Sequence, residues 1–236
     1  MTQPRTAPSI ASRGGAANIP CEECGLYKLC FAPRLRLAAT GGLKRLSLPA
    51  GATLPGMPGP TACAVRSGAL EHQWVMPEGE VDVTGYRLPG EALSLAEGPG
   101  AASWVALQPS HLCMLPRGEV ARLLAGERRT ALALMRLLLQ DSEGVLAGLQ
   151  RARHGSALQR MASVLLDLRR RLRTGSHLVL PMSRRSLAAH MDMTLATASR
   201  ALSTLETRGI LRRRGRRVEI RDPDALAHVA ERPAES

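Results

Sequence analysis

The sequence predicts an α+β protein in which a small antiparallel β-domain precedes a long helix and a compact C-terminal helical domain. With 236 residues, the chain is long enough for two domains that each bury a core. Between about Leu43 and Pro116, short apolar segments alternate with glycines, which is typical of a small antiparallel barrel or roll. From Arg117, leucine and alanine become dense and no proline occurs before Pro181, a composition typical of helices.

These changes in composition divide the chain into four parts. Residues 1–19, rich in Gly, Ala, Pro and Ser, are predicted to form a flexible arm. Residues 20–116 form the β-domain with a cysteine-rich loop at its start, residues 117–154 a long helix, and residues 155–236 the C-terminal domain. No apolar run reaches the roughly 18 residues that cross a bilayer, and the first 20 residues contain no apolar signal segment. We therefore expect a cytoplasmic protein without a membrane partner.

The charge of the chain points to a polyanionic partner. The formal net charge is +12 at pH 7, and neutralisation of phosphates by such a surface drives binding to nucleic acid. Seven arginines crowd one short stretch: Arg208, Arg212, Arg213, Arg214, Arg216, Arg217 and Arg221. This clustering favours a localised binding site over a merely soluble basic surface.

Two helices are predicted between the β-domain and Pro181. In the first, candidate core positions, all apolar except Ser142, recur in steps of three and four residues: Met135, Leu138, Ser142, Val145, Leu149 and Ala152. This spacing fits either a coiled-coil seam with a second chain or a helix that packs on its own domain. The second helix is predicted to start at Ser156 as N-cap and to end near Gly175. It places Leu158, Met161, Leu165, Leu168 and Leu172 on one face.

The segment after Pro181 predicts a winged helix-turn-helix. Ser183 can cap a first short helix, Asp192 tolerates a left-handed turn conformation, and Thr194 can cap a second helix. Residues 209–211 and 217–220 are predicted to form two strands around a turn at Gly215. Together, the two helices and the basic hairpin indicate a protein that binds double-stranded DNA.

Three cysteines fall within ten residues in the pattern C-x2-C-x5-C: Cys21, Cys24 and Cys30. Thiols stay reduced in the cytosol, so we interpret these cysteines first as metal ligands. Thiolates suit zinc or an iron-sulfur cluster, and Cys113 or His111 could be the fourth ligand. A thiol redox switch is the main alternative. Cys63 lies in an apolar segment and is predicted to be a buried packing residue.

Several short motifs accompany the cysteines: Val65-Arg66-Ser67-Gly68, Leu88-Pro89-Gly90-Glu91, Cys113 before Leu115-Pro116, and Thr197-Ala198-Ser199-Arg200. In this order, and over about residues 20 to 230, the chain resembles the CRP/FNR superfamily, in particular its oxygen-sensing FNR branch. The resemblance implies a β-roll sensor domain of the double-stranded β-helix, cyclic-nucleotide-binding-like type and a dimerisation helix. It also implies a homodimer that binds a palindromic DNA site and acts on RNA polymerase.

By the same resemblance, Cys21, Cys24, Cys30 and Cys113 would hold an oxygen-labile 4Fe-4S cluster. Cyclic-nucleotide-binding relatives carry an arginine after the Gly-Glu of the roll. Here no arginine lies between Glu91 and Arg117, so an anionic ligand would lack its counter-charge. We therefore expect no cyclic nucleotide.

The resemblance and the predicted fold also indicate which residues touch DNA. Thr197, Ser199 and Arg200 would lie on the recognition helix in the major groove. The wing arginines are predicted to contact phosphate because they flank a turn glycine: Arg213, Arg214 and Arg216. Ala196 stands where relatives often carry a glutamate. Alanine can contact a thymine methyl but cannot accept a hydrogen bond from cytosine, so we expect a different half-site.

Two alternatives to a cluster-switched regulator remain at this point. One is the same DNA-binding protein with structural zinc or a thiol switch. The other is an iron-sulfur electron-transfer protein whose basic tail docks an acidic partner. The sequence contains no Walker A loop, no GxGxxG after a strand and no paired catalytic set. We therefore do not expect an enzyme.

Overall fold

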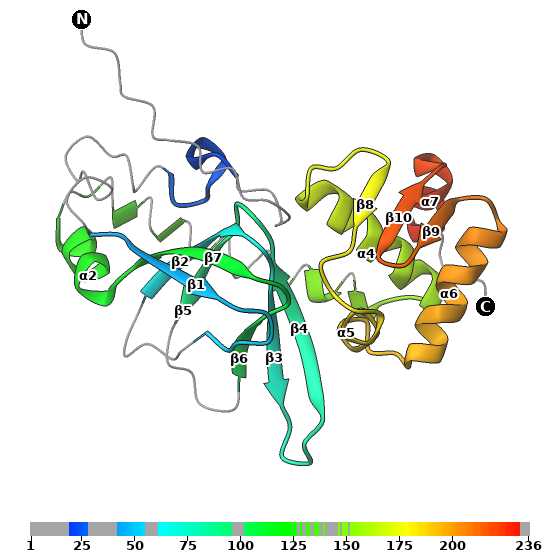
Figure 1. The fold of residues 1–236 in the computed structure, drawn as a ribbon, viewed down its shortest axis with the longest axis horizontal. Coiled ribbons are helices and arrows are strands. Elements are labelled where there is room, and N and C mark those ends of the chain that lie inside the picture. Colours follow the sequence, from blue (N-terminus) through cyan, green and yellow to red (C-terminus); the bar gives the residue numbers. More distant parts are fainter. Residues whose placement is uncertain are drawn as a thin grey trace, which may run out of the picture.

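The computed structural model shows a β-roll and a helical domain that lie side by side (Figure 1). It describes residues 19–27, 42–54, 61–95, 102–126 and 152–231. Between 127 and 151 it also describes residues 128, 131, 132, 135, 136, 139, 146 and 148–150. The predicted fold class, a β-roll with a C-terminal winged helix-turn-helix, is confirmed.

The roll consists of two antiparallel sheets with strand orders β1-β7-β2-β5 and β4-β3-β6. Its strands are β1 (Lys44–Leu48), β2 (Thr61–Ser67), β3 (Leu70–Val75), β4 (Val81–Arg87), β5 (Ala92–Leu95), β6 (Ala102–Ala106) and β7 (Ser110–Leu115). The two sheets enclose a core that includes Val65, Leu70, Leu93 and Leu112. Ala64, which faces away from its neighbour Cys63 along β2, is also fully buried. Both faces of β2 are therefore covered.

The predicted turn glycines close the strands of the roll. All four have positive φ angles, which residues other than glycine rarely adopt: Gly51, Gly68, Gly79 and Gly90. At Gly68, a Cβ would also lie 2.2 Å from the Ser110 side-chain oxygen. The turn after Val65-Arg66-Ser67 therefore requires glycine for two independent reasons.

The helix predicted from residue 117 is interrupted. Helix α2 (Arg117–Ala125) ends where the backbone bends at Gly126, and the described residues beyond it are again helical. Of the predicted seam, Met135 is 52% exposed, Leu149 is half-buried and Ala152 is buried. Leu138, Ser142 and Val145 lie outside the described residues. The seam therefore stays a prediction.

The C-terminal domain consists of four helices and a small three-stranded sheet. The helices are α4 (Ala157–Arg171), α5 (Arg184–His190), α6 (Leu195–Thr207) and α7 (Pro223–Glu231). The sheet has the order β8-β10-β9, with β8 (His177–Val179), β9 (Leu211–Arg214) and β10 (Arg217–Ile220). Strand β8 and helix α7 are additions to the predicted winged helix-turn-helix.

The predicted helix starts are confirmed, but one helix ends early. Ser156 forms a reciprocal capping box with Gln159: its hydroxyl accepts from the Gln159 N–H at 3.3 Å, and its own N–H donates to Gln159 Oε1 at 2.7 Å. Helix α4 then ends at Arg171, four residues before Gly175. Arg173 itself adopts the left-handed conformation, with φ of 51°. The expectation that Gly175 ends this helix was wrong because an arginine supplies the turn.

No helix within the described ranges is long and apolar enough to cross a membrane.

Candidate DNA interface and cysteine site

The helix-turn-helix is held rigid by local hydrogen bonds. The Ser183 hydroxyl accepts from the Ser186 N–H at 3.1 Å, and the Thr194 hydroxyl accepts from the Thr197 N–H at 3.1 Å. Between α5 and α6, Asp192 has the predicted left-handed conformation, with φ of 49°. Arg160 of α4 donates to the carbonyl oxygens of Met191 and Asp192, at 2.6 and 3.3 Å. These bonds from Arg160 therefore fix the turn between α5 and α6, and with it the direction of α6.

Helix α6 has one buried, apolar face and one exposed, polar face. It packs inward through four apolar side chains: Ala198, Ala201, Leu202 and Leu205. Arg200 and Ser203 lie on the exposed side, and Ala196 is exposed one turn earlier. Ser199 is half-buried, and so is Thr197, which bonds to the Thr194 hydroxyl at 2.9 Å. Ser203 was missed by the sequence reasoning, although its spacing of three from Arg200 places it on the same face.

The wing has two faces because side chains alternate along its strands. Leu211 and Arg213 of β9 lie on the face toward α6, opposite Ile220 and Val218 of β10. On this inner face the Arg213 guanidinium pairs with Glu206 of α6, with Nε 2.9 Å from Oε2.

Two further bonds fix Arg213. Its backbone N–H donates to Glu206 Oε1 at 3.0 Å, and its Nη2 donates to the Ser203 hydroxyl at 2.8 Å. Hydrogen bonds from the Arg213 backbone and side chain lower the pKa of Glu206 below its ordinary value. This side chain therefore braces the wing against the recognition helix.

Arg216 also has internal partners. Its Nε donates to the Leu180 carbonyl at 3.1 Å, and its Nη2 donates to the carbonyl of Pro181. Arg214 and Arg217 face each other across the hairpin, both exposed, and their side chains have no partner among the described residues. The sequence reasoning did not select Arg217. The alternation of the two strands would have identified it as the outward neighbour of Arg214.

The described part of the cysteine loop, residues 19–27, lies on the edge of the roll (Figure 1). It contains a short 3-10 helix, η1 (Cys21–Glu23), and Leu26 is 1% exposed. The Gly25 N–H donates to the Gly90 carbonyl at 2.8 Å, and the Ile19 N–H donates to the Arg66 carbonyl at 3.1 Å. A Cβ at Gly25 would lie 3.2 Å from the Gly90 oxygen. The residue after the second cysteine is therefore tightly confined.

Three of the four predicted ligands, Cys21, Cys24 and Cys113, lie within the described residues. Cys113 lies on β7 between Arg45 of β1 and Ala64 of β2. Burial raises the pKa of Cys24, a hydrogen bond from the Leu26 backbone lowers it, and the thiols of Cys113 and Cys21 raise it again. Burial likewise raises the pKa of Cys113, whereas the charge of Arg66 lowers it. Burial is therefore the main reason why the pKa values of Cys24 and Cys113 are raised.

The described candidate ligands do not by themselves form a metal-binding group. Within the described ranges, no three His, Cys, Asp or Glu side chains lie close enough to hold an ion. Cys30 lies outside the described residues. The Nε of Arg66 is buried and has no hydrogen-bond partner within the described chain. A cationic donor without a partner next to soft thiol ligands fits an anionic sulfur-rich group.

His111, the alternative fourth ligand, and Cys63 lie in other surroundings. His111 shares a hydrogen bond of 2.9 Å between its Nδ1 and the Ser47 hydroxyl on β1. Cys63 is fully buried, and burial together with the neighbouring Cys113 raises its pKa to about 12. The prediction that Cys63 is a buried packing thiol is confirmed.

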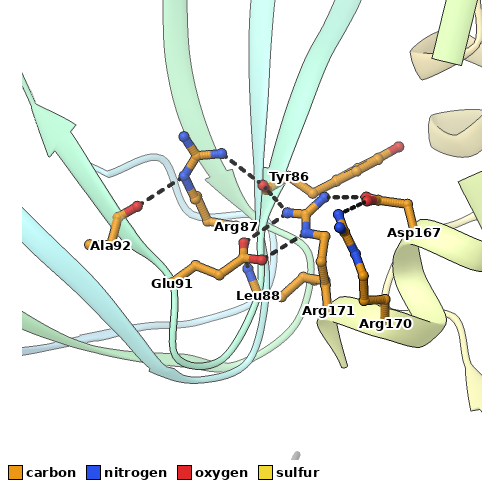
Figure 2. A network of polar contacts seen from close by, with 8 residues as sticks. All are labelled: Tyr86, Arg87, Leu88, Glu91, Ala92, Asp167, Arg170 and Arg171. Carbon is orange, nitrogen blue, oxygen red and sulfur yellow. Dashed lines mark hydrogen bonds and ion pairs between the residues drawn. The ribbon is translucent and has the colours of Figure 1, made fainter. Parts of the chain in front are cut away.

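One polar network, which the sequence reasoning missed, joins the roll to the DNA-binding domain. Figure 2 shows Arg171, the last residue of α4, between Glu91 of the roll and Asp167 of its own helix. Its Nε and Nη2 lie 2.7 Å from the two Glu91 carboxylate oxygens, and Nη2 also donates to the Tyr86 carbonyl at 2.7 Å. Burial lowers the pKa of Arg171, but the paired carboxylates of Glu91 and Asp167 together outweigh burial and raise it above its ordinary value.

Contacts between β4 and α5 extend this junction. The Tyr86 hydroxyl donates to the Ser186 carbonyl at 3.0 Å. His190 Nδ1 lies 3.1 Å from the Val83 carbonyl oxygen, and its ring packs edge-on against Tyr86. Burial lowers the pKa of His190 to about 4. The helix-turn-helix is thus docked on the roll through the contacts of Tyr86 and His190.

Comparisons with known proteins agree with this architecture. Residues 159–229 match the Crp-like helix-turn-helix domain family. The chain is 28% identical to the transcriptional activator protein FnrA of Stutzerimonas stutzeri, over 89% of this chain and 92% of that protein. It is 30% identical to the transcriptional regulatory protein btr of Bordetella pertussis, over 70% of this chain and 71% of that protein.

Solved structures show the same arrangement of domains. FixK2 from Bradyrhizobium japonicum superimposes with a TM-score of 0.73 at 25% identity, covering 81% of this chain and 99% of that one. A CooA mutant from Carboxydothermus hydrogenoformans gives a TM-score of 0.68, with 87% and 95% covered. At 16% identity, the likeness to CooA concerns the fold alone.

Proposed function

The chain belongs to the CRP/FNR family of DNA-binding transcription regulators, and we propose that it acts as a dimer whose DNA affinity depends on an oxygen-labile 4Fe-4S cluster. In this proposal Cys21, Cys24, Cys30 and Cys113 hold the cluster. When bound, the cluster supplies iron and sulfide that react with oxygen, and its loss would report air. Relatives that include the fumarate and nitrate reduction regulatory protein of Escherichia coli, 24% identical over 92% of this chain, support a role in anaerobic gene regulation.

The cysteine site carries this proposal. The charge of Arg66 lowers the pKa of both Cys24 and Cys113 against the raising effect of burial, and the buried Arg66 Nε has no partner within the described residues. A cluster held by four thiolates is anionic, so a guanidinium beside it offsets the negative charge and can donate a hydrogen bond to sulfur.

For DNA recognition, we propose that Arg200 reads a base edge in the major groove, with Ser199 and Thr197 beside it. Arginine can pair with guanine through two hydrogen bonds. Of the three wing arginines predicted to contact phosphate, Arg214 has a side chain without partners among the described residues. Because Arg213 and Arg216 are bonded inside the domain, we propose that they shape the wing.

Dimerisation would cover apolar side chains that one chain leaves in water. Four of the described helical residues beyond Gly126 are exposed and apolar: Leu132, Met135, Leu139 and Leu146. An apolar surface of this kind marks an interface, and a symmetric dimer would match two half-sites of a palindrome. We also propose RNA polymerase as a partner of this regulator.

The contacts of Glu91 support the expectation that no cyclic nucleotide binds. Its carboxylate already accepts from Arg171 and from the Leu88 N–H at 2.9 Å. The segment after it contains no arginine before Arg117.

Metal analysis of anaerobically purified protein tests the proposal. We expect about four iron and four sulfide ions per chain in the wild type and their loss in Cys113→Ser. The matched control is Cys63→Ala, which removes a thiol from the core and should keep the cluster. Zinc without sulfide would favour a structural zinc site, and air-sensitive DNA binding without any metal would favour a thiol switch. Sedimentation of the same samples measures the dimer.

A further inference from the structure

We propose that two arginines of the DNA-binding domain position the cysteine loop: Arg171 through the turn Leu88–Glu91, and Arg173 through a direct ion pair with Glu23. The DNA-binding domain then forms part of the support of the cysteine site, and each stabilises the other. The role of this coupling in sensing rests on the function proposed above. The contacts themselves do not involve a metal.

The first contact is the pair between Arg171 and Glu91 (Figure 2). The guanidinium meets the carboxylate in a two-pronged geometry, with both nitrogen–oxygen distances at 2.7 Å. The side chains are 21% and 26% exposed, so solvent screens this pair less than one at the surface. Asp167 fixes the same guanidinium from its other side, with Nη1 3.0 Å from Oδ2. Arg171 therefore approaches Glu91 in a fixed direction.

The turn that carries Glu91 also holds the cysteine loop. The Gly90 carbonyl accepts from the Gly25 N–H at 2.8 Å, next to the second cysteine. The turn is tied to β2 by two further bonds: the Gly90 N–H donates to the Val65 carbonyl at 2.8 Å, and the Val65 N–H donates to the Glu91 carbonyl at 3.0 Å. With φ of +94°, Gly90 passes so close to the loop that a Cβ there would lie 3.1 Å from the Glu23 carbonyl. The loop and Arg171 thus contact adjacent residues, Gly90 and Glu91, of one short turn.

A second contact joins the loop to the end of α4 directly. Glu23, between the first two cysteines, pairs with Arg173 at 2.5 Å. These side chains are 43% and 67% exposed, so the pair alone adds little stability. It does, however, reach the loop from the same end of α4 as Arg171. The two contacts hold the loop at two points, Glu23 and Gly25.

Mutual stabilisation follows from thermodynamic linkage. If docking of α4 favours the ordered loop, an ordered loop must favour docking of α4 to the same extent. Arg171 would thus act on the cysteines as a positioning residue, through Glu91 and Gly90. Its neighbour Arg170 provides a matched control, because it is 72% exposed and its ion pair within the described chain is with Asp167.

Hydrogen exchange of the full-length, metal-free protein tests the proposal. In Arg171→Gln, we expect the peptide around Gly25 to exchange about tenfold faster than in wild type, the change expected when a charge-assisted pair is removed. Arg170→Gln should match the wild type. Arg171→Lys, which keeps the charge but lacks the two-pronged geometry, should fall between them. Peptides from the core of α4 should exchange as in wild type in every variant.

Equal exchange around Gly25 in Arg171→Gln and Arg170→Gln would overturn the proposal. If Arg171→Gln does not fold, Glu91→Gln breaks the same pair from the roll side and the same comparison applies. In protein loaded with iron and sulfide, Arg171→Gln should also lose its absorbance faster in air than Arg170→Gln. Protein that never holds a cluster would refute the proposed function but leave the exchange result as the test of this coupling.

Discussion

The outward-facing wing arginines offer a direct measurement of DNA contact. Arg214 and Arg217 oppose each other at the tip of the hairpin, without side-chain partners in the described structure. Removal of one arginine–phosphate interaction lowers the slope of log affinity against log salt by about 0.9. Replacement of Arg214 by Gln in a dimer removes two such interactions, so the slope should fall by about 1.8. The factor by which affinity falls between about 50 and 200 mM salt should therefore be roughly twelvefold smaller for Arg214→Gln than for wild type.

The assay is fluorescence anisotropy of a labelled duplex over a salt series. Arg214→Gln should weaken binding to specific and unrelated duplexes alike, because phosphates carry no sequence information. The matched variant is Arg213→Gln, one residue away on the inner face. It should leave the slope unchanged and instead lower the free energy of unfolding by up to about 1 kcal/mol, since the Glu206 pair is partly exposed.

An unchanged slope in Arg214→Gln would refute the assignment of the outer face. A decrease in slope in Arg213→Gln as large as that in Arg214→Gln would show that the bond to Glu206 opens when DNA binds.

Three further outcomes are expected. Arg200→Ala should cost about 1 to 3 kcal/mol on the specific duplex and relax preference at one base pair; equal weakening on every sequence would make it a phosphate contact. Burial lowers the pKa of His190 from 6.5 to about 4, so the unfolded chain binds a proton at a higher pH than the folded protein does. The free energy of unfolding is therefore highest above pH 6.5 and falls toward pH 4, by up to about 1.4 kcal/mol per pH unit. Denaturant titrations of His190→Asn should show a flatter pH dependence than wild type, and an equal slope would contradict this. Gly25→Ala should speed cluster loss in air, whereas Gly85→Ala, whose Cβ would meet no atom within 4 Å, should not; equal rates would count against the tight docking of the loop.

The local features of the fold could be predicted from the sequence because neighbouring residues determine them. Ser156, Ser183 and Thr194 cap their helices with their own side chains, and Asp192 and Gly215 adopt left-handed conformations at the predicted turns. Helix α7 was missed although the signal was present. The Asp222 carboxylate accepts from the Ala225 N–H at 2.8 Å, and Pro223 follows it as the first helical residue.

The features that the sequence did not reveal depend on tertiary contacts. Arg171 and Glu91 lie 80 positions apart, and no local pattern relates them. Arg213 and Arg214 are the same residue type in the same basic run, but the strand register turns Arg213 toward Glu206. For the cysteine site, spacing predicted three ligands and the family resemblance the fourth, whereas the packing of Gly25 against Gly90 and the unpartnered Arg66 Nε became visible only in the described fold.

Anaerobic DNA titration before and after exposure to air tests the central claim most directly. The duplex is one selected from a random pool by cluster-loaded protein, and iron and sulfide are measured on the same samples. A change of about 3 kcal/mol in dimer stability alters association more than a hundredfold. We therefore predict that air exposure of the wild type, and Cys113→Ser without air, both weaken binding by at least about this factor and yield monomers in sedimentation. If Cys113→Ser remains dimeric and binds as tightly as the cluster-loaded wild type, a cluster does not gate this regulator.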